Sequence, residues 1–260
     1  TIYTNLDTVM LGMMTTDDQV GYYNAAVKIK GILASVVTAM SAVLLPRVSY
    51  YLSNNNRNEF LRIIQKTFQF VLLISIPLVV FFDLAAKPAI MILAGKDYFP
   101  SIIPMQIITP AIVFIGIGSI TAWQMLIPLC MENVTVIGAV VGAIIDLVIN
   151  FFLIPMFGAS GAAIGTLIAE IGVVCVHFWA LRAELRHITL GRETIKIMVA
   201  AGVSIVVYIV VDHFLFDGYI LIRLAILGGS YFISYFLFLL AGREEIATEY
   251  ARKMMEHFFK

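Results

Sequence analysis

Long apolar segments alternate with short polar ones along this sequence, and the alternation predicts membrane-crossing helices. A hydrocarbon core about 30 Å thick requires about twenty mainly apolar residues per helix. After a partial helix that ends near Met14, complete spans are expected at residues 20–46, 67–82, 101–129, 134–155, 159–181, 195–211 and 219–241. Because lipid offers no partners for backbone N–H and C=O groups, such segments must satisfy them internally. The predicted fold class is therefore all-α, a polytopic transmembrane helix bundle.

Composition supports lipid as the solvent. The chain of 260 residues is 61% hydrophobic and 13% charged, whereas soluble domains are roughly 45–50% apolar and about 25% charged. The formal net charge is +0, so no basic surface points to a nucleic-acid partner. Cys130 and Cys175 have no metal-ligand spacing, and we expect small buried hydrophobic side chains rather than a metal site.

The distribution of Lys and Arg predicts the orientation in the membrane. One set of connecting segments carries Arg47, Arg57, Arg62, Lys66, Arg182, Arg186, Arg192, Lys196, Arg243, Arg252, Lys253 and Lys260. The opposite side carries Lys87 and Lys96. Residues 50–66, residues 182–196 and the C-terminus are thus expected in the cytoplasm. Residues 58–65 and 245–259 have amphipathic patterns that predict helices lying on the membrane surface.

The first residues already form part of an apolar helix, without a charged leader or a cleavage site. This pattern does not predict a signal peptide. We expect the chain to be a fragment that begins at a helix boundary and lacks an N-terminal half.

Several stretches carry a family resemblance. They are NLDTVMLG at 5–12, VGYYNAA at 20–26, LPRVS at 45–49, GKDYFPS at 95–101 and NFFLIPMFGASGAAIGT at 150–166, followed by Glu170. They resemble the second half of lipid-linked oligosaccharide flippases of the multidrug, oligosaccharidyl-lipid and polysaccharide exporter superfamily. The resemblance extends to about Leu181.

The resemblance implies the second lobe of a two-lobe, inverted V-shaped exporter fold that rocks around a central cavity. Residues 1–181 would form this lobe, with one partial and five complete spans. Residues 182–241 would add two transmembrane helices, and residues 242–260 a cytoplasmic amphipathic tail. The implied protein is a multi-pass protein of the bacterial inner (cytoplasmic) membrane.

The function implied by the resemblance is the flipping of an undecaprenyl-diphosphate-linked oligosaccharide by alternating access, for polysaccharide biosynthesis. The implied partners are the lipid-linked oligosaccharide, membrane lipids and the missing N-terminal lobe, with polysaccharide polymerase machinery as a further candidate. Two alternatives stay open: a drug/cation antiporter of the same superfamily, and a non-transporting membrane scaffold for polysaccharide assembly.

Motifs for chemistry are absent from the sequence. It has no phosphate-binding glycine loop with Lys, no zinc-type His-Glu helix pair and no nucleophile with a plausible base. We therefore expect a protein that is not an enzyme and has no cofactor. The energy for transport would come from a proton or sodium gradient, or from the substrate gradient.

Two carboxyl groups near the middle of predicted spans are candidates for ion coupling. A carboxylate at the centre of a membrane helix costs roughly 2.5–3.5 kcal/mol on insertion scales, so it is rarely retained facing lipid. Asn150 lies four residues after Asp146, and Thr166 lies four before Glu170, so each acid belongs to a polar stripe. Asp146, Glu170 and Asn150 are the predicted coupling residues. Buried structural acids remain the alternative.

The predicted substrate-binding residues are Lys28, Asp7, Asn24 and Gln124. Lys28 belongs to a stripe of small and polar residues, namely Gly21, Asn24, Lys28, Gly31, Ser35 and Thr38, which predicts that it faces the cavity. It would bind the diphosphate, with Asp7 as its resting partner on the preceding antiparallel helix. A purely structural ion pair is the alternative. Lys30 lies elsewhere on the helix and would snorkel or pair with other groups.

Glycine and proline positions predict local packing. Gly138 and Gly142 in one span, and Gly158, Gly161 and Gly165 at the start of the next, are typical of close contact between antiparallel helices. Pro104 and Pro110 are expected to bend the span at residues 101–129.

Overall fold

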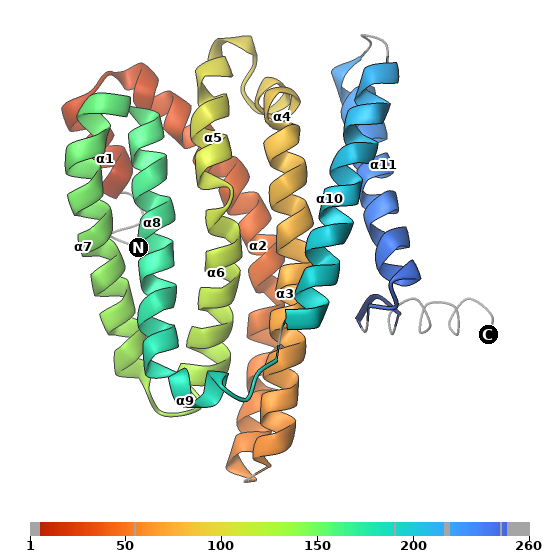
Figure 1. Ribbon diagram of the computed structural model, residues 1–260. Coiled ribbons are helices and arrows are strands. Elements are labelled where there is room, and N and C mark those ends of the chain that lie inside the picture. The colour runs from red at the N-terminus through yellow and green to blue at the C-terminus, as the bar shows by residue number, and fades with distance from the viewer. Residues whose placement is uncertain (1–5, 55, 190, 216–218, 245, 249–260) are drawn as a thin grey trace.

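The computed structural model of this chain describes residues 6–54, 56–189, 191–215, 219–244 and 246–248. The elements in chain order are α1 (Leu6–Met14), α2 (Asp17–Ser53), α3 (Arg57–Leu84), α4 (Ala86–Leu93), the 3₁₀ helix η2 (Lys96–Ser101), α5 (Ile102–Ile108), α6 (Ala111–Ser119), the π-helix η3 (Ile120–Leu126), α7 (Glu132–Phe157), α8 (Ala159–Ala180), α9 (Arg182–Leu185), α10 (Gly191–Phe214) and α11 (Ile220–Ala241). Every element of the described chain is helical, so the predicted all-α bundle is confirmed (Figure 1).

Six described helices are long and apolar enough to cross a membrane, and a bent pair raises the number to seven. The pair is Lys96–Ile108 and Ala111–Leu126, which meet at 46°. The break contains Pro110, whose ring cannot donate a backbone hydrogen bond and crowds the preceding turn. The bend expected from proline is therefore confirmed at this position. The number of membrane-length helices makes the chain a multi-pass membrane protein.

The predicted surface helix at residues 58–65 is wrong. These residues form the first turns of α3, which continues without a break into the apolar span. The amphipathic pattern arises because this end of α3 packs on one side only, with Phe60 and Ile64 buried. Most of the second predicted surface helix, at 245–259, and of the tail at 242–260 lies outside the described residues.

Helices α7 and α8 pack closely against each other. A Cβ added at Gly161 would lie 2.3 Å from the backbone oxygen of Leu153, and one at Gly142 would lie 2.6 Å from Val173. Only a hydrogen atom fits at such positions, and the close approach maximises van der Waals contact where lipid provides no hydrophobic driving force. The turn between the helices is Gly158, with φ +55°. The predicted small-residue packing is confirmed.

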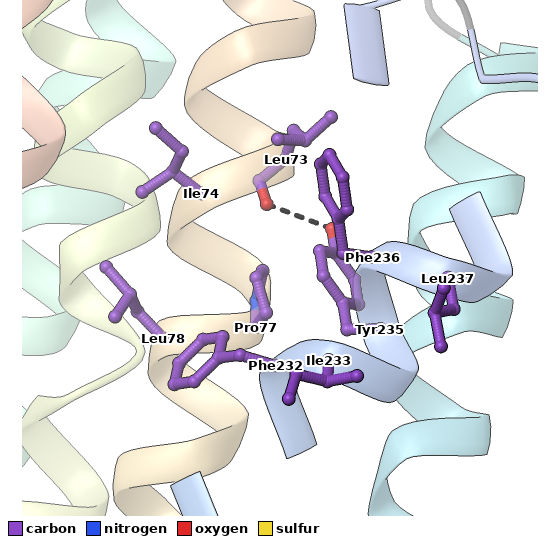
Figure 2. A pocket seen from close by; sticks show the side chains of 9 residues that line it. All are labelled: Leu73, Ile74, Pro77, Leu78, Phe232, Ile233, Tyr235, Phe236 and Leu237. Carbon is purple, nitrogen blue, oxygen red and sulfur yellow. Dashed lines mark hydrogen bonds between the residues drawn. The ribbon is translucent and has the colours of Figure 1, made fainter. Parts of the chain in front are cut away.

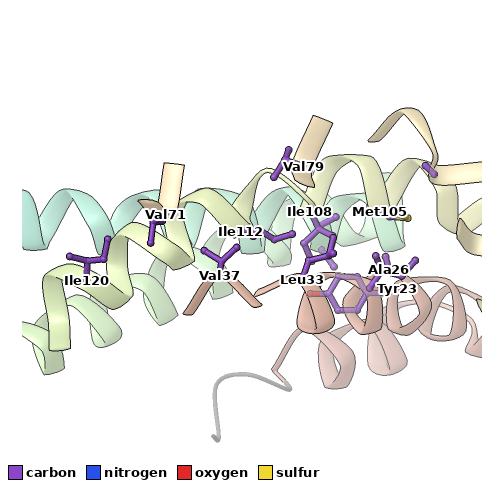
Figure 3. Packing of buried hydrophobic residues seen from close by; sticks show 14 of the residues in the cluster. Tyr23, Ala26, Leu33, Val37, Val71, Val79, Met105, Ile108, Ile112 and Ile120 are labelled. Carbon is purple, nitrogen blue, oxygen red and sulfur yellow. The ribbon is translucent and has the colours of Figure 1, made fainter. Parts of the chain in front are cut away.

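The main core lies where α2, α3, α5 and α6 meet (Figure 3). Its largest fully buried side chains include Tyr23 of α2, Phe68 of α3, and Met105, Ile108 and Ile112 of the bent span. Because these side chains are buried at the same crossing, the bent span is clamped between α2 and α3.

Helices α10 and α11 form a hairpin at the edge of the bundle, against α3 (Figure 1). The Tyr235 hydroxyl donates a hydrogen bond of 2.9 Å to the backbone oxygen of Leu73. The Phe81 ring lies 5.5 Å from the ring of Tyr231 and 5.2 Å from that of Phe232. These contacts join the two extra C-terminal spans to α3. The division into domains at Leu181 stays a prediction.

Candidate functional site

A buried cluster of polar side chains joins α1, α2, α7 and α8. We call it the Asp7 network, and its members are Asp7, Tyr23, Asp146, Asn150 and Thr166. The Tyr23 hydroxyl donates to Asp7 Oδ2 at 2.5 Å, Thr166 Oγ1 donates to the same oxygen at 3.1 Å, and Asn150 Nδ2 donates to Asp7 Oδ1 at 2.8 Å. All five residues are less than a tenth exposed.

Two carboxyl groups meet in the Asp7 network. Asp146 lies next to both Asp7 and Asn150. Two carboxylates about 4 Å apart repel by about 4 kcal/mol in a partly screened interior. A proton or a cation placed between them relieves this repulsion. The cluster is therefore suited to hold one positive charge at membrane depth.

Two oxygens of the network are buried without a hydrogen-bond partner among the described residues, namely Asp146 Oδ1 and Asn150 Oδ1. Both lie against Gly165 of α8: a Cβ added there would be 3.1 Å from the former and 2.1 Å from the latter. An unsatisfied buried polar group costs about 1–3 kcal/mol. Both oxygens have lone pairs that can accept a hydrogen bond, and Asp146 Oδ1 can carry a proton.

Lys30 and Glu170 lie beside the Asp7 network. Both are partly buried, and the Lys30 ammonium is in electrostatic range of Glu170, Asp7 and Asp146. The ammonium partly compensates the three acids. Lys30 therefore lies near acidic groups inside the bundle, although no ion pair among the described residues includes it.

The expected pairing of Asp7 with Lys28 is wrong. Asp7 is held by neutral donors, and Lys28 forms no ion pair with any residue that the structure describes. The reason is rotational: the side of α2 that contains Tyr23 and Lys30 faces α1, α7 and α8, whereas Lys28 and Gly31 are exposed. The stripe that contains Lys28 thus forms an open face of this chain.

The other predicted substrate residues differ in their surroundings. Asn24 is half-buried on the stripe and its Oδ1 accepts a hydrogen bond of 3.4 Å from Thr8 Oγ1. Gln124 is fully buried within the π-helix η3, while the neighbouring Trp123 is exposed. In this conformation Gln124 offers no surface to a sugar. Its expected role as a direct substrate contact finds no support in its position.

An apolar hollow of about 510 Å³ lies between α3 and α11 (Figure 2). It is lined by Leu73, Ile74, Pro77, Leu78, Phe232, Ile233, Tyr235, Phe236 and Leu237. The single phenol in this lining is bonded to the α3 backbone. The hollow is suited to a hydrocarbon chain.

Sequence reasoning missed Tyr23 and Thr166 as partners of Asp7. The spacing in the sequence groups Thr166 with Glu170 rather than with Asp7, and it gives Tyr23 no role. A tyrosine at membrane depth carries a hydroxyl that requires a partner when buried. That requirement was the available signal.

Comparisons with known proteins agree with this architecture. Residues 1–103 match the family model described as polysaccharide biosynthesis protein. An uncharacterized membrane protein of Methanocaldococcus jannaschii is 27% identical over 216 residues, which is 83% of this chain and 42% of that protein. The probable flippase AglR of Haloferax volcanii is 27% identical over 177 residues, which is 64% of this chain and 35% of AglR.

The fold has a solved counterpart. A structure of the lipid II flippase MurJ, in an inward closed conformation, superposes with a TM-score of 0.77 at 18% identity, covering 92% of this chain and 51% of that one. The chain resembles the flippases of the multidrug, oligosaccharidyl-lipid and polysaccharide exporter superfamily. It spans about half the length of this flippase structure, and less than half of the sequence relatives. At family level its relatives are membrane flippases rather than enzymes.

Proposed function

We propose that this chain forms one lobe of a membrane transporter that flips a lipid-linked oligosaccharide by alternating access. The observation that carries the proposal is the Asp7 network, an oxygen-rich cluster buried at membrane depth between four helices. Polar groups of this kind are costly inside a membrane and mark ion pathways. The similarity to flippases supports the substrate class, and the undecaprenyl-diphosphate carrier is part of the proposal.

The Asp7 network would couple transport to a proton or sodium gradient. Asp7 belongs to α1, whereas Asp146 and Asn150 belong to α7. A proton or cation bound by these residues would hold α1 against the α7–α8 pair, and its release would leave adjacent carboxylates that repel each other. Ion binding would thereby favour one arrangement of α1 and α2 over another. Glu170 and Lys30 would adjust the charge of the cluster.

The substrate would meet two surfaces of the chain. The exposed stripe with Lys28 would line the cavity between this lobe and an N-terminal lobe, where the ammonium attracts a diphosphate. The apolar hollow between α3 and α11 would accept part of the polyprenyl chain, because its lining is almost entirely hydrocarbon.

Transport in proteoliposomes tests the proposal. The full-length protein that contains this chain is reconstituted with a polyprenyl-diphosphate-linked oligosaccharide, and a membrane-impermeant glycosidase reports the exposed sugar. We expect Lys28→Ala to abolish flipping and Lys28→Arg to retain part of it. Lys30→Ala should change the ion dependence and leave the apparent affinity for substrate largely intact.

Two outcomes would contradict the proposal. A folded Lys28→Ala protein with full activity would eliminate the role of Lys28 in binding the diphosphate. Uptake of organic cations without any flipping of lipid-linked sugar would identify the antiporter alternative, which the acidic groups Asp146 and Glu170 favour.

A further inference from the structure

A polar hollow of about 370 Å³ lies where α3 begins, against the segment that follows α9. Its lining residues are Asn58, Leu61, Arg62, Gln65, Lys66, Gln69 and His187. This group contains basic and amide side chains and no acid. It lies at the end of the bundle opposite α4 (Figure 1), away from the Asp7 network.

The hollow is a built feature rather than an open surface. Gln65 Nε2 donates a hydrogen bond of 3.0 Å to the backbone oxygen of Thr189, which holds the segment after α9 against α3. Gln69 lines the inner end of the hollow, and the residue as a whole is only 2% exposed. The Gln69 amide therefore offers two N–H donors and one oxygen acceptor to a polar ligand in the hollow.

The position of the hollow along α3 indicates which layer of the membrane surrounds it. This helix has 28 residues, which gives a length of about 42 Å, whereas the hydrocarbon core is about 30 Å thick. The apolar part begins near Thr67, so Asn58 to Lys66 extend beyond the hydrocarbon. The headgroup layer is therefore the environment of the hollow.

We propose that this hollow binds the phosphate of an anionic phospholipid headgroup. Arg62 would donate to two phosphate oxygens in the forked geometry that guanidinium groups form with phosphate. A ring N–H of His187 and the amide of Gln69 would donate to the remaining oxygens. Arg62 reaches Glu59 at 3.4 Å, three residues away, with the Arg62 side chain 66% exposed and the Glu59 side chain 39% exposed. Such an exposed pair is weak and exchanges readily for a phosphate.

A membrane lipid is the source of the phosphate, because the hollow lies in the layer where headgroup phosphates are concentrated. This inference is independent of the transported substrate.

Lipid titration of the purified chain, followed by native mass spectrometry, tests the inference. Phosphatidylglycerol is compared with phosphatidylcholine of the same acyl chains. The double variant Arg62→Gln, His187→Gln should bind phosphatidylglycerol roughly tenfold more weakly, since two charge-assisted donors are lost. The matched control is Arg47→Gln, Arg186→Gln, which removes two basic groups from the same end outside the hollow and should leave the affinity within about twofold.

A second variant, Gln69→Leu, keeps the volume and removes the amide, and it should also weaken binding. Three results would overturn the inference: equal weakening in the control pair, equally tight binding of phosphatidylcholine, or unchanged binding in both variants that target the hollow. Displacement of the lipid by inorganic phosphate at a matching affinity would identify a soluble anion as the ligand instead.

Discussion

Replacing Gly165 by alanine should break the Asp7 network from its α8 side. The added Cβ would lie 2.1 Å from Asn150 Oδ1 and 2.9 Å from Asn150 Cγ. These distances are too short for any real contact, so Asn150 must move by about 1 Å. Such a shift separates Asn150 Nδ2 from Asp7 Oδ1, which it now reaches at 2.8 Å.

The loss of folding stability caused by Gly165→Ala can be estimated from the contacts that change. Overpacking costs about 1–3 kcal/mol, and loss of a hydrogen bond to a charged group costs about 1.5–3 kcal/mol. The higher helix propensity of alanine offsets up to about 1 kcal/mol. The net loss is about 2–5 kcal/mol, which corresponds to a fall in unfolding temperature of roughly 5–20 °C for a chain of this size.

The matched control is Gly202→Ala in α10, where an added Cβ meets nothing within 4 Å. Its unfolding temperature should stay unchanged or rise slightly, because only the propensity gain remains. Thermal unfolding of detergent-solubilised protein, measured in sodium and in choline at constant ionic strength and at several pH values, checks both variants. We expect the native sequence to be stabilised by sodium or by protons, and Gly165→Ala to lose this dependence.

Similar behaviour of the two glycine variants would refute the reasoning. If Gly165→Ala unfolded at the same temperature as Gly202→Ala, with the same ion dependence, then α7 and α8 would not approach as closely as the structure has them. If Gly165→Ala unfolded at a lower temperature but kept its ion dependence, the close packing of α7 on α8 would be supported and a coupling role of Asn150 would be excluded.

Four further outcomes are expected. Asp146→Asn and Glu170→Gln should each weaken ion-dependent transport while the protein stays folded, since amides keep shape and polarity but do not titrate. If transport by both variants kept the same dependence on pH and sodium, Asp146 and Glu170 would be structural acids without a coupling role. Burial raises the pKa of Glu244 above 4.5, and nearby Glu193 adds to this, against the lowering effects of backbone N–H groups and Lys196. The folded protein therefore holds this proton more tightly than the unfolded chain, and its stability should fall as the pH rises above about 4.5. A Glu244→Gln protein should lose that part of the pH dependence of thermal unfolding. Cysteine placed at Ser53 in a cysteine-free background should resist impermeant reagents in intact cells, and ready labelling from outside would invert the predicted orientation. The chain alone should not flip substrate, because alternating access requires a second lobe, and flipping at the full-length rate would contradict the two-lobe interpretation.

Span positions were readable from the sequence because the signal is local. Each segment of about twenty apolar residues must form a helix wherever it lies in lipid, whatever its neighbours are. The bend at Pro110 was equally predictable, since the missing N–H and the ring belong to one residue. Close packing of α7 on α8 followed from glycine spacing, as two helices joined by a short turn can only lie antiparallel.

The partners of the candidate site were decided by the tertiary structure. Helical periodicity correctly separated Lys28 from Lys30, but it could not tell which side of α2 would face the bundle. That choice depends on α1, α7 and α8, and Tyr23 and Thr166, which are 143 residues apart, meet only when these helices pack together. The sequence determined which groups must avoid lipid, because insertion costs act on each residue separately. Only the packed bundle decided that Asp7 lies against Asp146 rather than Lys28, since that contact depends on the rotation and depth of helices far apart in the chain.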